Sequence, residues 1–247
     1  MRQNFSFCFF SVHLLAIITL ACGDAHLRQD FKAENNRPVL PNTLAVLYFR
    51  NVAELNEWQP LLKGVAAILI ADLGKVRRLR LVERGQVEAL LQEHGLSSAQ
   101  LYDRFTAPRA GRVLGAQRVI VGGAMAVGEA GILIDAGVLE TANGDMIGRS
   151  VSSGGRLSEI LRVEKELLFG LLDQLGIKLS DEEHAALQQP TTHSALAFAS
   201  YCRGLDYADR HDFANARKAF KEALRQDSDF TEAKKEMEKL EITEREE

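Results

Sequence analysis

The residues that could carry out catalysis or hold phosphate are few and scattered along the chain. A glycine-rich run at 122–128, GGAMAVG, invites comparison with a phosphate-binding loop, but it lacks the Gly-Lys-Ser/Thr that holds phosphate and metal. A strand pattern follows it, so its glycines indicate bulges or close backbone approach in a sheet. Gly154-Gly155 follow two serines, yet the sequence has no Gly-x-Ser-x-Gly motif and no general base to activate a nucleophile.

Metal ligands are equally sparse. The chain has six histidines and three cysteines, at positions 8, 22 and 202. No histidine after residue 21 lies three or four residues from another or has a cysteine partner, so a local metal site is not expected. Without a nucleophile, a base or a ligand set in a recognisable arrangement, the sequence predicts a protein that is not an enzyme and needs no cofactor.

Two groups of charged residues on predicted elements have structural explanations. Glu83-Arg84 stands at the end of a predicted buried strand and is interpreted as a structural ion pair or a cap. Glu164 and Glu166 fall on a predicted helix, where a solvated face explains them. Neither group predicts a catalytic site.

The basic cluster at 75–80, KVRRLR, is the sharpest local charge feature, and its arginines are Arg77, Arg78 and Arg80. It could bind anionic headgroups, a glycan or an acidic patch on a partner. A loop kept soluble by its charge is the alternative, because one stretch of four cations falls short of the polybasic clusters that bind membranes.

The N-terminus carries an export signal. Residues 1–21 place Arg2 ahead of a short apolar run that ends in small residues, which is typical of a cleaved signal peptide. Cys22 follows Ala21 directly and resembles the lipid-attachment cysteine of bacterial lipoproteins, although Thr19-Leu20 depart from the usual residues there. Gly23 instead of Asp after the cysteine favours the outer membrane. Ordinary cleavage near Ala21, or a retained anchor, is the alternative.

Composition places the remainder among globular proteins. Apolar residues make up 46% of the chain and charged residues 26%, which excludes disorder and fibrous repeats. The net charge of −4 gives no global attraction to nucleic acid. Residues 22–43 are polar and read as a flexible tether. With Cys8 removed and Cys22 lipidated, Cys202 stands alone, so the core must hold without a disulfide.

Residues 44–177 predict one α/β domain. The apolar run at 44–49 suits a buried strand, and helical periodicity follows at 54–73. A further strand is predicted at 80–82. Helices are predicted at 86–94 and at 98–114, the second with a break at Pro108, and a last helix at 158–175 closes the domain. Three antiparallel strands are predicted at 118–121, 131–139 and 146–152, with a type I′ turn at Asn143-Gly144. The first unit is a βαβ crossover, so we expect a mixed sheet of about five strands flanked by helices.

These residues resemble a known family. The phrases LVER at 81–84, LGA at 114–116, VIVG at 119–122 and ANGD at 142–145 stand in the order found in CsgG-type curli-assembly lipoproteins and TolB N-terminal-like periplasmic domains. The resemblance covers about residues 44–176. It implies an envelope protein that works in assembly or docking.

The C-terminal part predicts a small all-α unit. Ser180-Asp181-Glu182-Glu183 is a capping box that opens a short helix in a linker, 178–194. Residues 195–247 resemble a single tetratricopeptide repeat followed by a capping helix, since Gly204, Tyr207 and Phe220 stand at its offsets. One repeat cannot build a groove, so it should pack on the α/β domain, on another protomer or on a partner. If a groove face is used, we expect Phe198, Tyr201 and Leu205 on it.

The sequence therefore predicts a non-enzymatic lipoprotein that acts in the periplasm by protein–protein interaction. Its partners would be other envelope proteins, with a homo-oligomer left open, and it would reach the membrane through the lipid on Cys22. An oligomeric secretion pore is the alternative, which needs two long hairpins with strands of about 9–11 residues. The predicted strands are mostly shorter and are needed for the sheet itself.

Overall fold

The computed structural model describes residues 38–52, 58–94 and 106–246. The N-terminal part contains β1 (Thr43–Val46), β2 (Arg50–Asn51), α2 (Trp58–Leu73), β3 (Arg80–Leu81), α3 (Arg84–His94) and α5 (Ala107–Val113). The middle of the chain contains β4 (Arg118–Val127), β5 (Gly131–Glu140), β6 (Met146–Arg156), the 3-10 turn η1 (Leu157–Glu159) and α6 (Ile160–Gln174). The C-terminal part contains α7 (Asp181–Gln188), α8 (Ala195–Asp209), α9 (Phe213–Gln226) and α10 (Thr231–Glu246).

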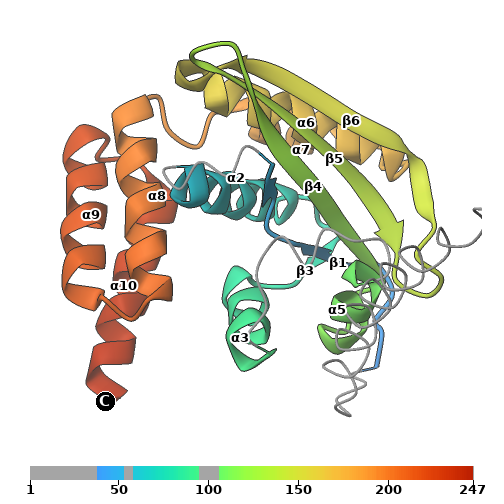
Figure 1. Ribbon diagram of the computed structural model, residues 1–247, viewed down its shortest axis with the longest axis horizontal. Coiled ribbons are helices and arrows are strands. Elements are labelled where there is room, and N and C mark those ends of the chain that lie inside the picture. The colour runs from blue at the N-terminus through green and yellow to red at the C-terminus, as the bar shows by residue number, and fades with distance from the viewer. Residues whose placement is uncertain (1–37, 53–57, 95–105, 247) are drawn as a thin grey trace, which may run out of the picture. The chain divides into compact units, whose positions relative to one another are not determined.

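The sheet is mixed, as the sequence predicts. Its strand order is β3-β1-β4-β5-β6, and the short β2 also pairs with β4. The strand β1 is parallel to β3 and to β4, whereas β4, β5 and β6 form an antiparallel meander. The parallel strands β1 and β3 are joined through α2, which confirms the expected βαβ opening (Figure 1).

The core lies between the sheet and the helices α2 and α6. Along β5, Ile132, Ile134, Ala136 and Val138 alternate onto one face and are at most 1% exposed. Helix α6 packs on this face: its Gly170 lies against the side chain of Val151 in β6. Alternation along the strand and the 3.6-residue period of the helix thus present complementary apolar surfaces.

Two local predictions differ from the structure. The strands β4, β5 and β6 are 10, 10 and 11 residues long, longer than predicted. The connection between β5 and β6 is not a type I′ turn: Gly144 has positive φ but Asn143 does not, and the Gly144 amide donates to the Glu140 carbonyl. Pro108 stands in the first turn of α5, where its missing amide costs nothing, so this helix begins at Ala107. Residues 54–57 and 98–105 of two predicted helices lie outside the described residues.

The C-terminal helices form a hairpin, α8 and α9, with α10 packed on α9. Gly204 in α8 lies against the ring of Phe220 in α9. A Cβ atom at this position would overlap the ring, so the close approach of the two helices requires glycine here. The ring of Tyr201 lies 5.9 Å from that of Phe220 and 4.9 Å from that of Phe230. The tetratricopeptide identity of this unit stays a prediction.

Side chains cap the starts of two C-terminal helices. Ser180 caps α7 and forms the predicted capping box with Glu183, whose side chain accepts from the Ser180 amide at 3.0 Å. Asp212 caps α9 by accepting from the Asn215 amide at 3.2 Å. Among the described residues, no helix is both long and apolar enough to span a bilayer.

Candidate functional site

The three apolar residues predicted on a groove face lie inside the molecule. Phe198, Tyr201 and Leu205 are exposed by 2%, 2% and 0%. Phe198 and its neighbour Cys202 face Gly64 of α2, where a Cβ atom would lie on the Cys202 sulfur. In this structure α2 packs on α8. Of the three expected ways of covering the hairpin, this is packing on the α/β domain. These side chains contact their own chain and present no free surface.

The basic cluster is exposed but partly paired. Side chains of Arg77 and Arg78 are 85% and 53% exposed, and Arg80 is also exposed. The Arg77 guanidinium lies 3.6 Å from Glu182, and that of Arg78 lies 4.0 Å from Glu183. The Arg77–Glu182 pair is exposed on both sides and contributes little to stability, whereas Glu183 of the second pair is buried. The cluster therefore remains accessible, next to the acidic start of α7.

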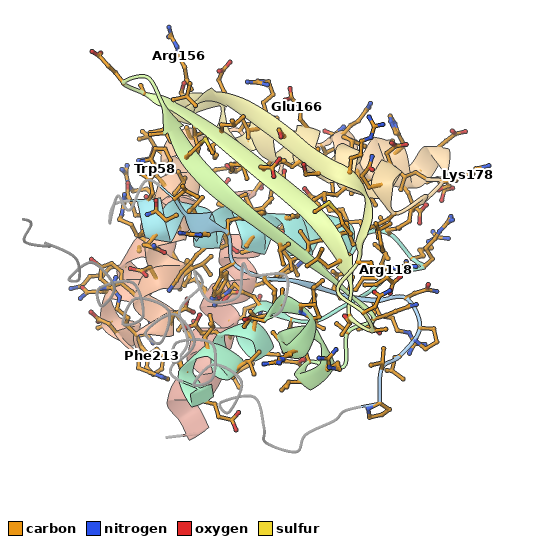
Figure 2. All side chains as sticks on the ribbon, turned by 45° about the vertical axis from the view of Figure 1, so that its right-hand side comes forward. Trp58, Arg118, Arg156, Glu166, Lys178 and Phe213 are labelled. Carbon is orange, nitrogen blue, oxygen red and sulfur yellow. The ribbon has the colours of Figure 1, made fainter. Side chains whose placement is uncertain are left out.

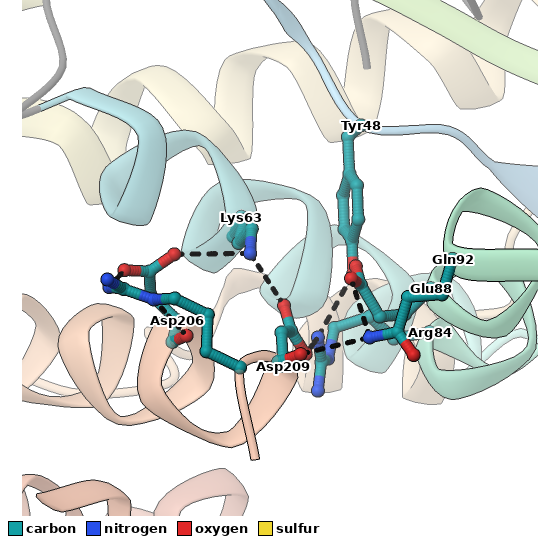
Figure 3. A network of polar contacts seen from close by, with 8 residues as sticks. Tyr48, Lys63, Arg84, Glu88, Gln92, Asp206 and Asp209 are labelled. Atoms are coloured by element: carbon teal, nitrogen blue, oxygen red, sulfur yellow. Dashed lines mark hydrogen bonds and ion pairs between the residues drawn. The ribbon is translucent and has the colours of Figure 1, made fainter. Parts of the chain in front are cut away.

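A polar network joins α2 and α3 to α8 (Figure 3). Nη1 of Arg84 donates to Oδ1 of Asp209 at 2.6 Å and to the hydroxyl of Tyr48 at 3.0 Å. Nζ of Lys63 lies 2.9 Å from Oδ2 of Asp209 and 3.2 Å from Oδ1 of Asp206. Two cations from the α/β part thus meet two carboxylates on one helix of the hairpin.

The network is shielded from water at its centre. The side chains of Arg84 and Asp209 are 13% and 4% exposed. Burial raises the pKa of the Tyr48 phenol well above its ordinary value, so the hydroxyl that accepts from Arg84 stays neutral. At low exposure, removing one ion leaves the other buried without its partner, which is strongly destabilising. This network therefore holds the hairpin on α2 and α3.

Sequence reasoning missed this network. It assigned Arg84 to a structural pair with Glu83 or to a cap, but the structure pairs Arg84 with Asp209, 125 residues away. The expectation for Glu164 is wrong as well: this side chain is 1% exposed and does not lie on a solvated face. The spacing held a signal, because Glu164 falls between Val163 and Leu167, within the apolar stripe of α6. Glu166 does lie on the surface, with its side chain 51% exposed.

Part of the second face of the sheet is exposed in the portion of the chain that the structure describes. Helix α5 packs there on Val119, but Met125 and Val127, which share this face by alternation, are 43% and 52% exposed. Val52 continues the row beyond β2 and is 46% exposed. Leu133 is paired with Met125 in the register of β4 and β5. An exposed apolar row of this kind on a sheet is a feature of interaction surfaces.

The described residues hold no group of His, Cys, Asp and Glu side chains that could bind a metal ion. Two features of the described chain are exposed: the basic cluster at 75–80 and the apolar row with Met125 and Val127. Cys22 lies outside the described residues.

Comparison with known proteins supports the resemblance drawn from the sequence. Residues 28–131 match the family model described as "Curli production assembly/transport component CsgG". The match runs from the tether to the start of β5, so it includes three of the four quoted phrases and ends before the turn at 142–145. The CsgG resemblance is thereby confirmed over this range. No curated protein matches the chain.

Solved structures give weaker similarity. The C-terminal domain of LpoB from Salmonella enterica is 21% identical, with 53% of this chain and 92% of that chain covered and a TM-score of 0.33. Lipoprotein GNA1162 from Neisseria meningitidis is 18% identical, with 57% and 100% covered and a TM-score of 0.40. The C-terminal domain of LpoB from Escherichia coli is 19% identical, with 53% and 93% covered and a TM-score of 0.35. Similarity at this level carries no inference about function.

Proposed function

Starting from a chain whose residues 28–131 match the CsgG family, we propose that this protein is an exported bacterial envelope lipoprotein that acts by protein–protein interaction during assembly. The family match is the observation that carries the proposal, because its description names an assembly and transport component and not an enzyme. The signal peptide predicted at 1–21 and the cysteine that follows it agree with that location. We place the protein on the periplasmic side of the outer membrane.

Lipidation of Cys22 is the first testable part. Replacing the acylated thiol by a hydroxyl removes the attachment point, so Cys22→Ser should abolish labelling by radioactive palmitate and release the protein from the membrane fraction. Cys8→Ser is the matched control, because Cys8 leaves with the signal peptide. Unchanged labelling and fractionation of Cys22→Ser would contradict the anchor.

The contact surface is the second part. The proposal uses two exposed features of the described chain: the loop with Arg77, Arg78 and Arg80, and the apolar row with Met125. Phe198, Tyr201 and Leu205 are buried within this chain, so the proposal does not use them as a contact surface. The partner is another envelope protein or a second copy of this chain.

Site-specific photocrosslinking in intact cells tests this surface. A photoreactive residue at position 78 or 125 should give a discrete crosslinked band, identifiable by mass spectrometry. Lys218 is the control position, since it is exposed and belongs to α9 and not to either feature. Crosslinks of equal strength at all three positions, or none at 78 and 125, would count against an assembly surface there.

The secretion pore remains the alternative function. The strands β4 and β5 reach the length that a membrane-crossing hairpin needs, yet every residue of both is paired in the sheet that covers the core. Rings of the purified lipoprotein that conduct ions in planar bilayers would support the pore and overturn the proposal. A turnover activity of the purified chain would overturn it as well.

A further inference from the structure

A buried carboxyl group without a hydrogen-bond partner lies between α2 and α6. Glu164 is 1% exposed, and neither of its carboxyl oxygens has a hydrogen-bond partner among the described residues. An ionised carboxylate in such a place costs much more free energy than a neutral acid. The position therefore favours the protonated side chain.

The charged neighbours of Glu164 come from two elements. Asp72, at the end of α2, is fully buried, and its two oxygens lie 2.6 Å from Nζ of Lys75 and 2.5 Å from Nζ of Lys165. Both ammonium groups are thus already bound to Asp72. Burial first, and then the charge of Asp72, raise the pKa of Glu164 to about 8, against the opposing effect of Lys165 and Lys75.

This cluster also holds the segment that carries the basic loop. Lys75 follows α2, and its amide donates to the Asp72 carbonyl at 2.9 Å while its side chain binds the Asp72 carboxylate. On the other side, the Arg77 amide donates to Oε1 of Glu183 in α7 at 3.1 Å. The segment 74–79 is therefore fixed between the α2–α6 contact and α7.

We propose that Glu164 makes this segment a proton-linked clamp. In the closed state Glu164 keeps its proton next to Asp72. When α2 and the segment separate from α6, Glu164 meets water, its O–H bond breaks and the proton passes to the solvent. Opening also frees Arg77 and Arg78 from α7. The clamp does not depend on the proposed function, because the proton is held by the buried pair Glu164 and Asp72 whether or not a partner binds Arg77 and Arg78.

The sign of the pH dependence follows from linkage. The closed state binds a proton that the open state releases at any pH between about 4.5 and 8. Relative to the open state, the closed state is therefore most stable below about pH 4.5, and this difference in free energy shrinks as the pH rises towards about 8. One proton corresponds to a factor of about ten in the opening equilibrium for each pH unit.

Hydrogen exchange of the full chain tests the clamp. After correction for intrinsic exchange rates, protection of peptides within 69–82 should fall about tenfold per pH unit between pH 5.5 and 7.5. Glu164→Gln, which cannot lose a proton, should abolish this slope, whereas Glu166→Gln on the exposed side of α6 should keep it. Peptides from α9 serve as the internal reference, since only global unfolding would change them in parallel.

Two outcomes overturn the proposal: a wild-type protein without the slope, or the same slope in Glu164→Gln. If Glu164→Gln fails to fold, the titration of Glu164 in the wild-type protein still tests the proposal. The carboxyl carbon of Glu164, followed by nuclear magnetic resonance, should titrate near pH 8. Titration near the ordinary value of a glutamate would overturn the clamp.

Discussion

Arg84 on α3 and Asp209 on α8 form a buried ion pair, with 2.6 Å between Nη1 and Oδ1. The two residues come from parts of the chain that the sequence treats as separate units, and the pair is supported by Lys63 on α2. Gln92, also on α3, donates to the Asp209 carbonyl at 2.9 Å. Asp209 is thus the residue on which α2, α3 and α8 converge.

Asp209→Ala should destabilise the protein by about 2–4 kcal/mol, because it leaves the Arg84 guanidinium buried without its carboxylate. Chemical denaturation followed by circular dichroism measures the change in the free energy of unfolding. Asp229→Ala is the control: Asp229 is exposed, so its removal should change stability by at most about 0.5 kcal/mol. Equal effects of the two substitutions would show that the network does not hold the hairpin.

The Cys202 thiol should report on the same contact. Cys202 is 2% exposed, and burial raises the pKa of its thiol well above the ordinary value. In a Cys8→Ser/Cys22→Ser background it should therefore react with iodoacetamide only after unfolding at pH 8. Adding Asp209→Ala should accelerate the labelling at least about tenfold, as the hairpin separates from α2. Rapid labelling of the folded background protein would contradict the burial of this thiol.

Gly64→Ala tests the close packing of α2 on α8. The new Cβ atom would overlap the Cys202 sulfur and lie 3.3 Å from Cε2 of Phe198, so we expect a loss of about 1–3 kcal/mol. Gly85→Ala on α3 is the matched control, because nothing lies within 4 Å of the new atom there. That change should be neutral or stabilise the helix by up to about 1 kcal/mol. Thermal unfolding distinguishes the two variants, and a neutral Gly64→Ala would refute the packing argument.

The outer edge of β6 is covered by side chains, and removing them should promote association. The amides of Arg149 and Arg156 donate to Gln174 at 2.7 Å and Glu159 at 2.9 Å, and Arg162 donates to the Gly154 carbonyl at 3.1 Å. Figure 2 shows Arg156 and Arg118 at opposite ends of the long strands and Glu166 on α6 beside them. Free backbone groups on an edge strand recruit other strands.

The triple variant Glu159→Ala/Arg162→Ala/Gln174→Ala should therefore form concentration-dependent oligomers, measured by sedimentation velocity. A variant with three alanines on the exposed side of α9, at Lys218, Lys221 and Arg225, controls for the number of substitutions. Both variants remaining at the size of the wild-type protein would show that the edge does not need this cover.

Sequence periodicity predicted the elements better than their contacts. The apolar stripe of α6, the capping box at Ser180 and the meander β4–β6 follow from local patterns, since each depends on residues a few positions apart. Strand lengths were underestimated because glycines and serines continue β4 and β6 beyond their apolar residues. Pairing with β5, which no local pattern reveals, keeps these residues in the sheet.

The candidate site was harder to predict because its partners are distant in sequence. Phe198 is predicted on a groove face for a partner, but only the folded chain shows that α2 of the same chain lies against it. Arg84 carries no local mark of its partner on α8. The spacing places Glu164 within the apolar stripe of α6 and so favours burial. Glutamate is rarely buried in proteins, however, and this general tendency predicts an exposed side chain instead.

Helix α2 contacts the sheet and α6 on one side and α8 on the other, with Gly64 at the second contact. A force or a binding partner that displaces the C-terminal helices must therefore also move α2, the helix that packs on the core of the sheet. Strain at one extremity of the fold would reach the other without crossing any linker, so the two parts of the chain should respond to load as one body.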